Sequence, residues 1–233
     1  MLDKRSFEKE QMDNLELSGE DLNKTLSGLS IINKYLGNTS STFNAVKKEI
    51  LYTDKALKII DLGCGGGDNL RAISNWCKSN NRSIELIGID ANRHILEFAK
   101  QQNNSSRDIE YLQADILDSQ FILPNCDILI SSHFMYHFSD QQTADFLKKS
   151  KKNITTKIIF SELRRTSLAY FLYKIGSIFL PFSKIVKQDG LTAIARAFKK
   201  KELIHIFEIA GFKEYTIKYK WAFRFLILID TKN

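Results

Sequence analysis

The chain has 233 residues, a length that suggests one domain with embellishments or at most two. Of these residues, 43% are hydrophobic and 26% are charged, which excludes a disordered or fibrous chain and supplies enough apolar material for a full core. The net charge of +7 permits nucleic acid, anionic membranes or acidic substrates as partners but selects none of them.

The three cysteines, Cys64, Cys77 and Cys126, are scattered and form no CxxC pair. This usage fits a reducing compartment, so we expect a cytoplasmic protein. The first fifteen residues have no apolar core, and we therefore expect no signal peptide. No run of about 20 apolar residues is present, so we also expect no transmembrane segment.

Residues 1–53 are predicted to form a helical lid that packs on the domain after it, residues 54–233. Ser18–Asp21 resembles a capping box that starts a first helix, and Gly37 is expected to end that helix. The apolar positions at helical spacing are Leu22, Leu26, Leu29, Ile32 and Leu36 in this helix, and Phe43, Val46 and Ile50 in a second one.

From residue 57 onward, short apolar runs alternate with amphipathic helices. The expected strands are Leu57–Leu62, Ile84–Asp90, Ile109–Leu112, Asp127–Ser131 and Thr156–Ser161. Such alternation predicts parallel βαβ units with helices on both faces of a sheet. A capping-box pattern at Ser139–Gln142 is expected to open the helix before the fifth strand.

The end of the chain breaks this alternation. A helix over Glu202–Ala210 is expected to stop at Gly211, and two apolar runs, 213–220 and 222–230, follow with no helix between them. They predict an antiparallel hairpin at one edge, with the last strand inserted antiparallel. The expected fold class is therefore α/β: a Rossmann-like, doubly wound, seven-stranded sheet, mostly parallel. Residues 164–199 are predicted to form an apolar helical insertion after the fifth strand.

A glycine-rich turn follows the first strand and reads Asp61-Leu-Gly63-Cys64-Gly65-Gly-Gly67-Asp68. Glycines permit a tight turn and let a ligand touch the backbone. The dinucleotide fingerprint GxGxxG fails here, and no Walker lysine follows. Asp68 would repel a pyrophosphate near the helix start, so we expect a ligand without phosphates. A turn that binds no ligand is the alternative.

The spacing of Asp61, Gly63, Gly65 and Gly67 resembles the first motif of class I S-adenosylmethionine-dependent methyltransferases. The resemblance continues at later strand ends, and it implies S-adenosyl-L-methionine as the cofactor, with Asp90 on the ribose hydroxyls and Asp115 on the adenine amine. The cofactor-binding residues that it implies are Asp61, Gly63, Cys64, Gly65, Gly67, Asp90, Ala91, Asp115, Ile116 and Ser131. Taken singly, Asp90 also fits a helix cap and Asp115 a loop acid.

The segment Ser131–Phe138 resembles the post-fourth-strand region of ubiquinone/menaquinone-type and polyketide-tailoring methyltransferases. It lacks the Asn/Asp-Pro-Pro-aromatic motif of enzymes that methylate base amino groups. The resemblance implies secondary metabolism and a phenolic or polyketide-like acceptor, with His133 or His137 as the catalytic base. Either histidine can instead cap or pack, and with no third ligand in view we expect no metal.

The apolar stretch Leu168–Phe182 is expected to cover the site and form the acceptor pocket. The substrate-binding residues we expect are Tyr136, Arg164, Tyr170 and Arg196, although an arginine here can pair with an internal acid instead. Arg5 and Met12-Asp13 are expected to close over the cofactor.

The favoured activity is O-methylation of a small aromatic acceptor. The alternatives are ring-carbon methylation of a quinone precursor, tRNA or rRNA methylation, and a methyltransferase-like scaffold without activity. Because the insertion is apolar rather than basic, we expect a small-molecule partner and no nucleic acid. Lysine runs beside an apolar helix are compatible with peripheral membrane contact, in a monomer or a homodimer.

Overall fold

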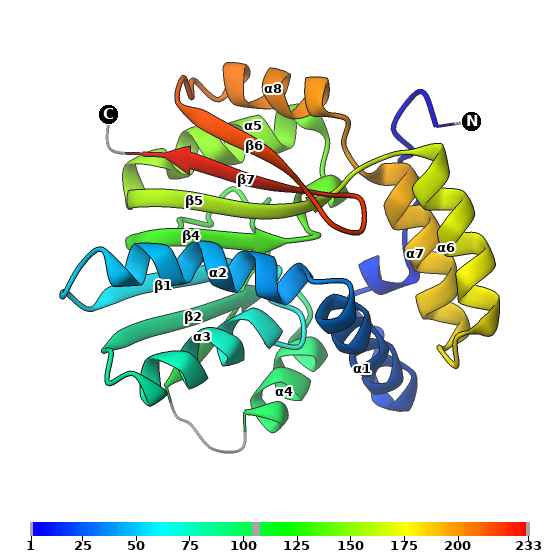
Figure 1. Cartoon of the computed structure of the whole chain (residues 1–233), viewed down its shortest axis with the longest axis horizontal. Helices are drawn as coiled ribbons and strands as arrows, with labels where there is room; N and C mark the ends of the chain where they lie inside the picture. Colours follow the sequence, from blue (N-terminus) through cyan, green and yellow to red (C-terminus); the bar gives the residue numbers. More distant parts are fainter. Residues whose placement is uncertain (1, 104–107, 232–233) are drawn as a thin grey trace.

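The computed structural model describes residues 2–103 and 108–231, and in these residues seven strands form one sheet (Figure 1). Their order is β3-β2-β1-β4-β5-β7-β6, with β1 to β5 parallel and β7 antiparallel to both neighbours. The strands are β1 (Leu57–Leu62), β2 (Ile84–Asp90), β3 (Ile109–Gln113), β4 (Cys126–Ser132), β5 (Ile154–Leu163), β6 (Tyr215–Lys220) and β7 (Arg224–Asp230). The predicted sheet is confirmed, including the inserted last strand.

The helices of the described residues follow the predicted order. They are α1 (Gly19–Tyr35), α2 (Asn38–Leu51), α3 (Asp68–Ser79), α4 (Arg93–Gln102), α5 (Asp140–Ser150), α6 (Ser167–Phe179), α7 (Lys184–Arg196) and α8 (Lys200–Ile209), with the short 3-10 turns η1 (Gln11–Asp13), η2 (Met135–His137) and η3 (Lys151–Asn153). The predicted insertion lies between β5 and α8 in the chain and forms helices α6 and α7, which lie side by side and run in opposite directions (Figure 1).

Two apolar layers hold the sheet between helices. On one face, α2 and α3 bury side chains such as Val46 and Ile73 against β1 and β2. On the other face, α5 and α8 bury side chains such as Leu147 and Ile206 against β4, β5 and β7. The parallel strands read as continuous apolar runs because both of their faces are covered.

The helix ends test the predicted caps. Ser139 forms the expected capping box with Gln142 at the start of α5. The prediction for Ser18 is wrong in detail: Ser18 is the N-cap of α1, but its side chain makes no capping hydrogen bond. The residue three positions on is Asp21, which is one methylene shorter than the Glu or Gln of the motif. Gly37 has φ 77° directly after α1, as expected for a residue that ends a helix.

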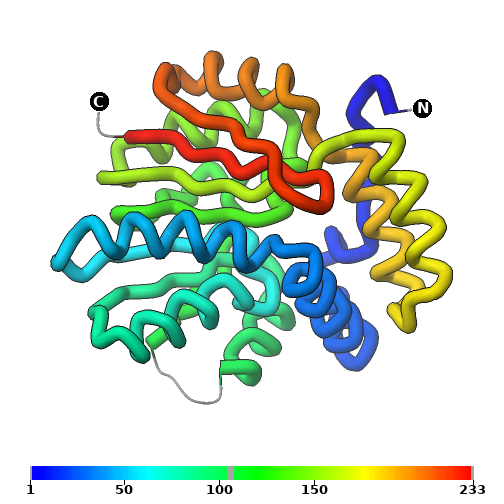
Figure 2. The backbone as a smooth tube through the Cα atoms, in the orientation of Figure 1, coloured from blue at the N-terminus to red at the C-terminus, as the bar shows by residue number. Residues whose placement is uncertain are grey.

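Helices α1, α6 and α7 gather beyond the carboxyl ends of the parallel strands, at the right of Figures 1 and 2. The N-terminal segment runs past the same edge, where Gln11 N and Met12 N donate to the Asp189 carboxylate of α7 at 2.9 and 3.0 Å. The predicted lid, residues 1–53, thus has two roles, because α2 covers the sheet while the preceding segment covers the strand ends. The boundary at residue 54 stays a prediction.

The outward face of α6 is apolar and exposed. Its residues include Leu168, Phe171, Ile178 and Phe179, which are 58 to 80% exposed. None of the helices described is both long and apolar enough to cross a bilayer.

Candidate functional site

A cavity of about 1010 Å³ opens at the carboxyl-terminal edge of the parallel strands. Small-molecule sites typically have about 300–1,000 Å³, so this cavity has room for a large ligand or two smaller ones. Its wall combines the N-terminal segment, α1, the glycine loop (residues 63–67), the turns after β2, β3 and β4, helices α6 and α7, and the β6–β7 turn. This is the edge at which doubly wound sheets bind ligands.

The glycine loop depends on backbone angles that favour glycine. Gly63, Gly65 and Gly67 have φ values of 61°, 52° and 80°. A Cβ on Gly63 would collide with the ring of Phe134, and one on Gly67 would lie 2.6 Å from Tyr111 Oη. The alternating glycines of the motif are therefore required by the turn itself and by its close neighbours.

Two acids, the buried Asp61 and the half-buried Asp90, flank this loop without a cationic partner among the described residues. Asp90 accepts hydrogen bonds from Gly65 N at 3.2 Å and Asn92 N at 3.1 Å, yet burial raises the pKa of Asp90. Asp61 is 1% exposed, and its two carboxylate oxygens have no hydrogen-bond partner in the described chain. Burial raises the pKa of Asp61 to about 8. A cationic ligand in the cavity would supply positive charge next to Asp90, which lines the cavity, and would act on the buried Asp61 through its charge alone.

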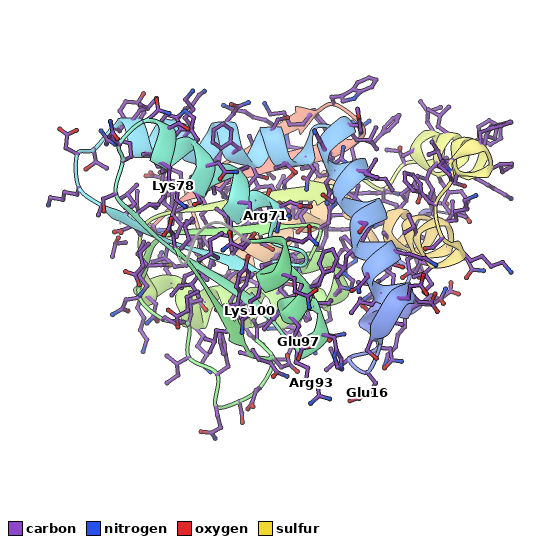
Figure 3. The ribbon with its side chains drawn as sticks, turned by 90° about the horizontal axis from the view of Figure 1, so that it is seen from below. Glu16, Arg71, Lys78, Arg93, Glu97 and Lys100 are labelled. Carbon is purple, nitrogen blue, oxygen red and sulfur yellow. The ribbon has the colours of Figure 1, made fainter. Side chains whose placement is uncertain are left out.

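A third acid, Asp68, lies at the start of α3 and is already neutralised. It pairs with Arg71, which is labelled in Figure 3, and it accepts from Ser30 Oγ at 3.0 Å. Arg71 also donates to Gly66 O. Arg71 is therefore paired with Asp68 and the loop backbone, and it forms no ion pair with Asp61 or Asp90.

Most of the expected cofactor residues line the cavity: Gly63, Cys64, Gly65, Asp90, Ala91, Asp115 and Ile116. Asp61, Gly67 and Ser131 do not. Ser131 is fully buried and its Oγ donates to Leu62 O at 3.0 Å. Ser132 lines the cavity instead, because successive strand residues point to opposite faces of a sheet.

His137 has an acidic partner from a distant part of the chain. Its Nδ1 lies 2.6 Å from Asp13 Oδ1, and Arg196 Nη1 donates to Asp13 Oδ2 at 2.6 Å. Although burial alone would raise it, the pKa of Asp13 lies below its usual value because His137 and Arg196 bond the carboxylate. Asp13 therefore orients the imidazole, so that Nε2 remains for a ligand in the cavity that His137 lines.

His133 lies in a different environment, although it lines the same cavity. Its backbone has φ 55°, and its Nε2 accepts a hydrogen bond from Arg224 Nε at 3.0 Å. Burial, together with the charge of Arg224, lowers the pKa of His133 well below its usual value. The imidazole is therefore neutral, and its Nε2 lone pair is already engaged.

The expected substrate residues divide into three groups. Tyr136 and Arg164 line the cavity, and the guanidinium of Arg164 lies over the rings of Tyr219 and Phe223. Arg196 also lines it but pairs with Asp13, so it follows the alternative of pairing with an internal acid.

Tyr170 was expected in the pocket and does not line it. The inward face of α6 carries Ala169, Leu172, Tyr173, Gly176 and Ser177. These positions follow helical periodicity, which places Tyr170 on another face of the same helix. Tyr173, and not Tyr170, is the tyrosine of α6 that lines the cavity.

Sequence comparison adds independent evidence. Residues 59–156 match a protein family described as "Methyltransferase domain". This segment includes the glycine loop, Asp90, and both histidines of the cavity. Residues 59–156 thus match a methyltransferase domain, which agrees with the predicted resemblance to class I methyltransferases.

Curated relatives of this chain are named carboxy-S-adenosyl-L-methionine synthase. The protein from Campylobacter jejuni subsp. doylei is 26% identical over 176 residues, which cover 70% of this chain and 72% of the relative. The protein from Helicobacter pylori is 25% identical over 187 residues, which cover 75% of each chain.

Solved methyltransferase structures share the fold. Human N-acetylserotonin methyltransferase, in complex with SAM, has a TM-score of 0.64 at 16% identity and matches 90% of this chain but only 55% of its own. The plantazolicin methyltransferase has a TM-score of 0.64 at 13% identity, over 88% of this chain and 89% of its own. At such identities the likeness concerns the fold alone.

Sequence reasoning did not single out several residues of the cavity, chiefly Asn69, Ser132, Tyr173 and Arg224, although Ser132 and Tyr173 lie in stretches that it assigned to the site. Asn69 Nδ2 donates to Ser132 Oγ at 3.1 Å, and Asn69 Oδ1 has no partner among the described residues. The sequence does distinguish Arg224, because it is the one basic residue of a strand that is apolar from Phe225 to Ile229. The other three carry no pattern that distinguishes them from ordinary helix or strand residues.

Proposed function

We propose that this methyltransferase transfers a methyl group from S-adenosyl-L-methionine to a hydroxyl group of a small, largely apolar acceptor. One observation carries the proposal: the buried carboxylate of Asp61 and the half-buried carboxylate of Asp90, which have no cationic partner among the described residues, flank a positive-φ glycine loop beside a cavity that is largely apolar elsewhere. The part of the cavity beside the glycine loop suits a methyl donor that carries sulfonium and ammonium charges but no phosphate.

The residues of the loop side fit this cofactor. Asp90, which already accepts from Gly65 N, would hold the ribose hydroxyls, and Asp115 would meet the adenine. The orphaned carboxylate of Asp61, close enough to Asp90 for their charges to interact, adds negative charge behind the loop. When bound, S-adenosyl-L-methionine supplies an electrophilic methyl group on a positively charged sulfur.

The other side of the cavity would activate and enclose the acceptor. His137 Nε2 takes the proton of the acceptor hydroxyl, and Asp13 stabilises the imidazolium that results. Tyr136, stacked on His137 with ring centroids 4.5 Å apart, fixes the ring plane. The inward faces of α6 and α7 exclude water, and alignment within such an enclosure accounts for much of the barrier reduction in a displacement of this kind.

The names of the bacterial relatives favour a second candidate, in which the chain makes a carboxylated derivative of S-adenosyl-L-methionine. The two candidates differ in what becomes of the methyl donor. Methyl transfer leaves S-adenosylhomocysteine, whereas the second activity leaves a heavier derivative. Mass spectrometry of the nucleoside product therefore distinguishes them.

Calorimetry with S-adenosylhomocysteine tests the cofactor half directly. We expect saturable binding, and we expect Asp90→Ala to weaken it at least tenfold because the acid that bonds the ribose is lost. Glu97→Ala on the exposed side of α4 is the matched control and should bind as the wild type does. If the wild type shows no binding, the chain is a scaffold without this cofactor.

A methyl-transfer screen then tests the acceptor half. Phenolic compounds, quinone precursors and total tRNA are offered with labelled methyl donor, and the label is traced. We expect label in the phenolic fraction. Label confined to tRNA would contradict the proposed acceptor class.

A further inference from the structure

Four arginines are buried in the described part of the chain, and three of them have an acidic partner. Arg5 pairs with Asp140, Arg165 with Glu202, and Arg196 with Asp13. Arg224, at the start of β7, is 2% exposed and has no carboxylate within ion-pair distance among the described residues. A buried charge without a counterion is costly to a fold, so its presence needs an explanation.

The protein partners of Arg224 are neutral acceptors. Nε donates to His133 Nε2 at 3.0 Å, and Nη1 donates to Leu36 O at 2.8 Å and more weakly to Ala222 O at 3.5 Å. Leu36 ends α1, and a helix C-terminus offers only about half a negative charge. Nη2 makes no hydrogen bond to any described residue, and the side chain lines the cavity. Burial lowers the pKa of Arg224 to about 10, which still leaves it charged at neutral pH.

The position of Arg224 separates it from the cofactor half of the cavity. In the sheet, β7 is three strands from β1, which leads into the glycine loop, and four from β2, which ends at Asp90. At about 4.8 Å per strand, the two halves are separated by roughly 14 Å or more along the sheet edge. Beside Arg224 the wall is formed by the apolar side chains of Leu163, Trp221 and Phe223, together with Arg164, whose guanidinium lies over the Phe223 ring.

We propose that Arg224 binds a carboxylate of the acceptor, with His133 as the positioning residue that orients the guanidinium. The inference rests on the proposed function, since it names the class of acceptor for the same site. The neutral His133 accepts the Nε–H of Arg224 and thereby holds the guanidinium in one orientation, with the Nη2 hydrogens free to donate to an anionic ligand. The acceptor is thus an aromatic or apolar molecule that carries both a hydroxyl and a carboxylate.

The test compares 4-hydroxybenzoate with its uncharged amide, 4-hydroxybenzamide, by calorimetry and thermal shift, with and without saturating S-adenosylhomocysteine. For the wild type we expect the acid to bind at least tenfold more tightly than the amide. Arg224→Met should abolish this preference and leave the affinity for S-adenosylhomocysteine within twofold of the wild type. His133→Leu should reduce the preference partly, whereas the conservative His133→Gln, which keeps an acceptor, should restore some of it.

Arg93→Met is the matched control, because it removes the same charge from the outer surface of α4, where Figure 3 labels Arg93. This control should keep the full preference for the acid. If Arg224→Met does not fold, Arg224→Gln takes its place, since the amide can still donate to Leu36 O.

Three results would overturn the inference: equal binding of acid and amide to the wild type, an acid preference that survives in Arg224→Met, or loss of S-adenosylhomocysteine binding in that variant. The last result would mean that Arg224 binds the carboxylate of the methyl donor and not a carboxylate of the acceptor. Failure of the proposed function looks different, because the wild type would then not bind S-adenosylhomocysteine at all, whatever its preference for the acid.

Discussion

His133 and His137 are one helical turn apart in sequence, but they have opposite surroundings. His133 accepts from Arg224 in a half-buried position in the cavity wall, whereas His137 is held by Asp13 and its Nε2 has no partner among the described residues. A base needs an available lone pair and a partner that stabilises its protonated form. These contacts favour His137 as the proposed base and give His133 a positioning role.

We predict that His137→Gln lowers kcat for a hydroxylated acceptor roughly 10²- to 10⁴-fold, the usual contribution of general base catalysis. Binding of S-adenosylhomocysteine should be unchanged. His205→Gln, on the exposed side of α8, is the control and should retain full activity. Steady-state kinetics check this, and a His137→Gln enzyme as active as the control would refute the proposed base.

Glu162 is a second residue whose environment has a measurable consequence. Its Oε1 accepts from Phe134 N at 3.3 Å and Met135 N at 3.0 Å, so it supports the turn that carries His137. Burial raises the pKa of Glu162 to about 7, although these two N–H groups oppose the shift.

Because the folded-state pKa of Glu162 is raised, the unfolded chain releases this proton more readily. The corresponding stability is present below about pH 4.5 and is lost as the pH rises through about 7. We predict that Glu162→Gln gains roughly 1–3 kcal/mol relative to the wild type between pH 5 and pH 8.5, because one pKa unit corresponds to about 1.4 kcal/mol. Urea unfolding at both pH values measures this, and a difference independent of pH would show that Glu162 is not protonated in the fold.

At the scale of elements, α6 and α7 act as a pair that encloses the acceptor half of the cavity. Tyr173 Oη donates to Val186 O at 2.7 Å across the pair, and its ring lies directly against Gly190 of α7. The outward face of α6 makes no comparable contact and is widely exposed. Peripheral membrane contact through that face remains a prediction from the sequence.

We predict that Gly190→Ala destabilises the protein by about 1–3 kcal/mol, since the new Cβ would overlap the Tyr173 ring. Gly176→Ala in α6 is the control, and we expect it to have the opposite effect. A Cβ added at Gly176 meets nothing within 4 Å, so this substitution should stabilise the protein by about 0.5–1 kcal/mol through helix propensity. Thermal unfolding of both variants decides this, and equal effects would mean that the two helices do not pack as described.

At the scale of the whole molecule, Arg5 joins three segments far apart in the sequence. It donates to Tyr136 O at 3.0 Å and Phe138 O at 2.7 Å in the turn after β4, and to Arg196 O at 3.1 Å at the end of α7. It also pairs with Asp140. The N-terminal segment is thereby fixed to the turn that carries His137.

We predict that Arg5→Ala lowers the free energy of unfolding by about 2–4 kcal/mol, because buried carbonyls and an acid lose their donor. Lys4→Ala, one residue earlier and exposed, should change it by less than about 0.5 kcal/mol. Denaturant unfolding compares them. A small effect of Arg5→Ala would show that the N-terminal segment is not part of the cooperative fold.

The sequence by itself determined the sheet, the hairpin at its edge, the insertion and the glycine loop. These features depend on local patterns: apolar runs of strand length, helical periodicity, and glycines at positions whose φ must be positive. The carboxyl ends of parallel strands meet at one edge, so Asp90 and Asp115 could be assigned to the cavity without knowledge of the packing.

Only the tertiary structure decided which side chains are paired and which are free. Asp13 meets His137, Arg224 meets His133, and Arg196 turns to an internal acid, and each pair joins segments at least 91 residues apart in the chain. Side-chain partners at such separations depend on how helices and turns pack in three dimensions. Periodicity within one segment carries no information about them.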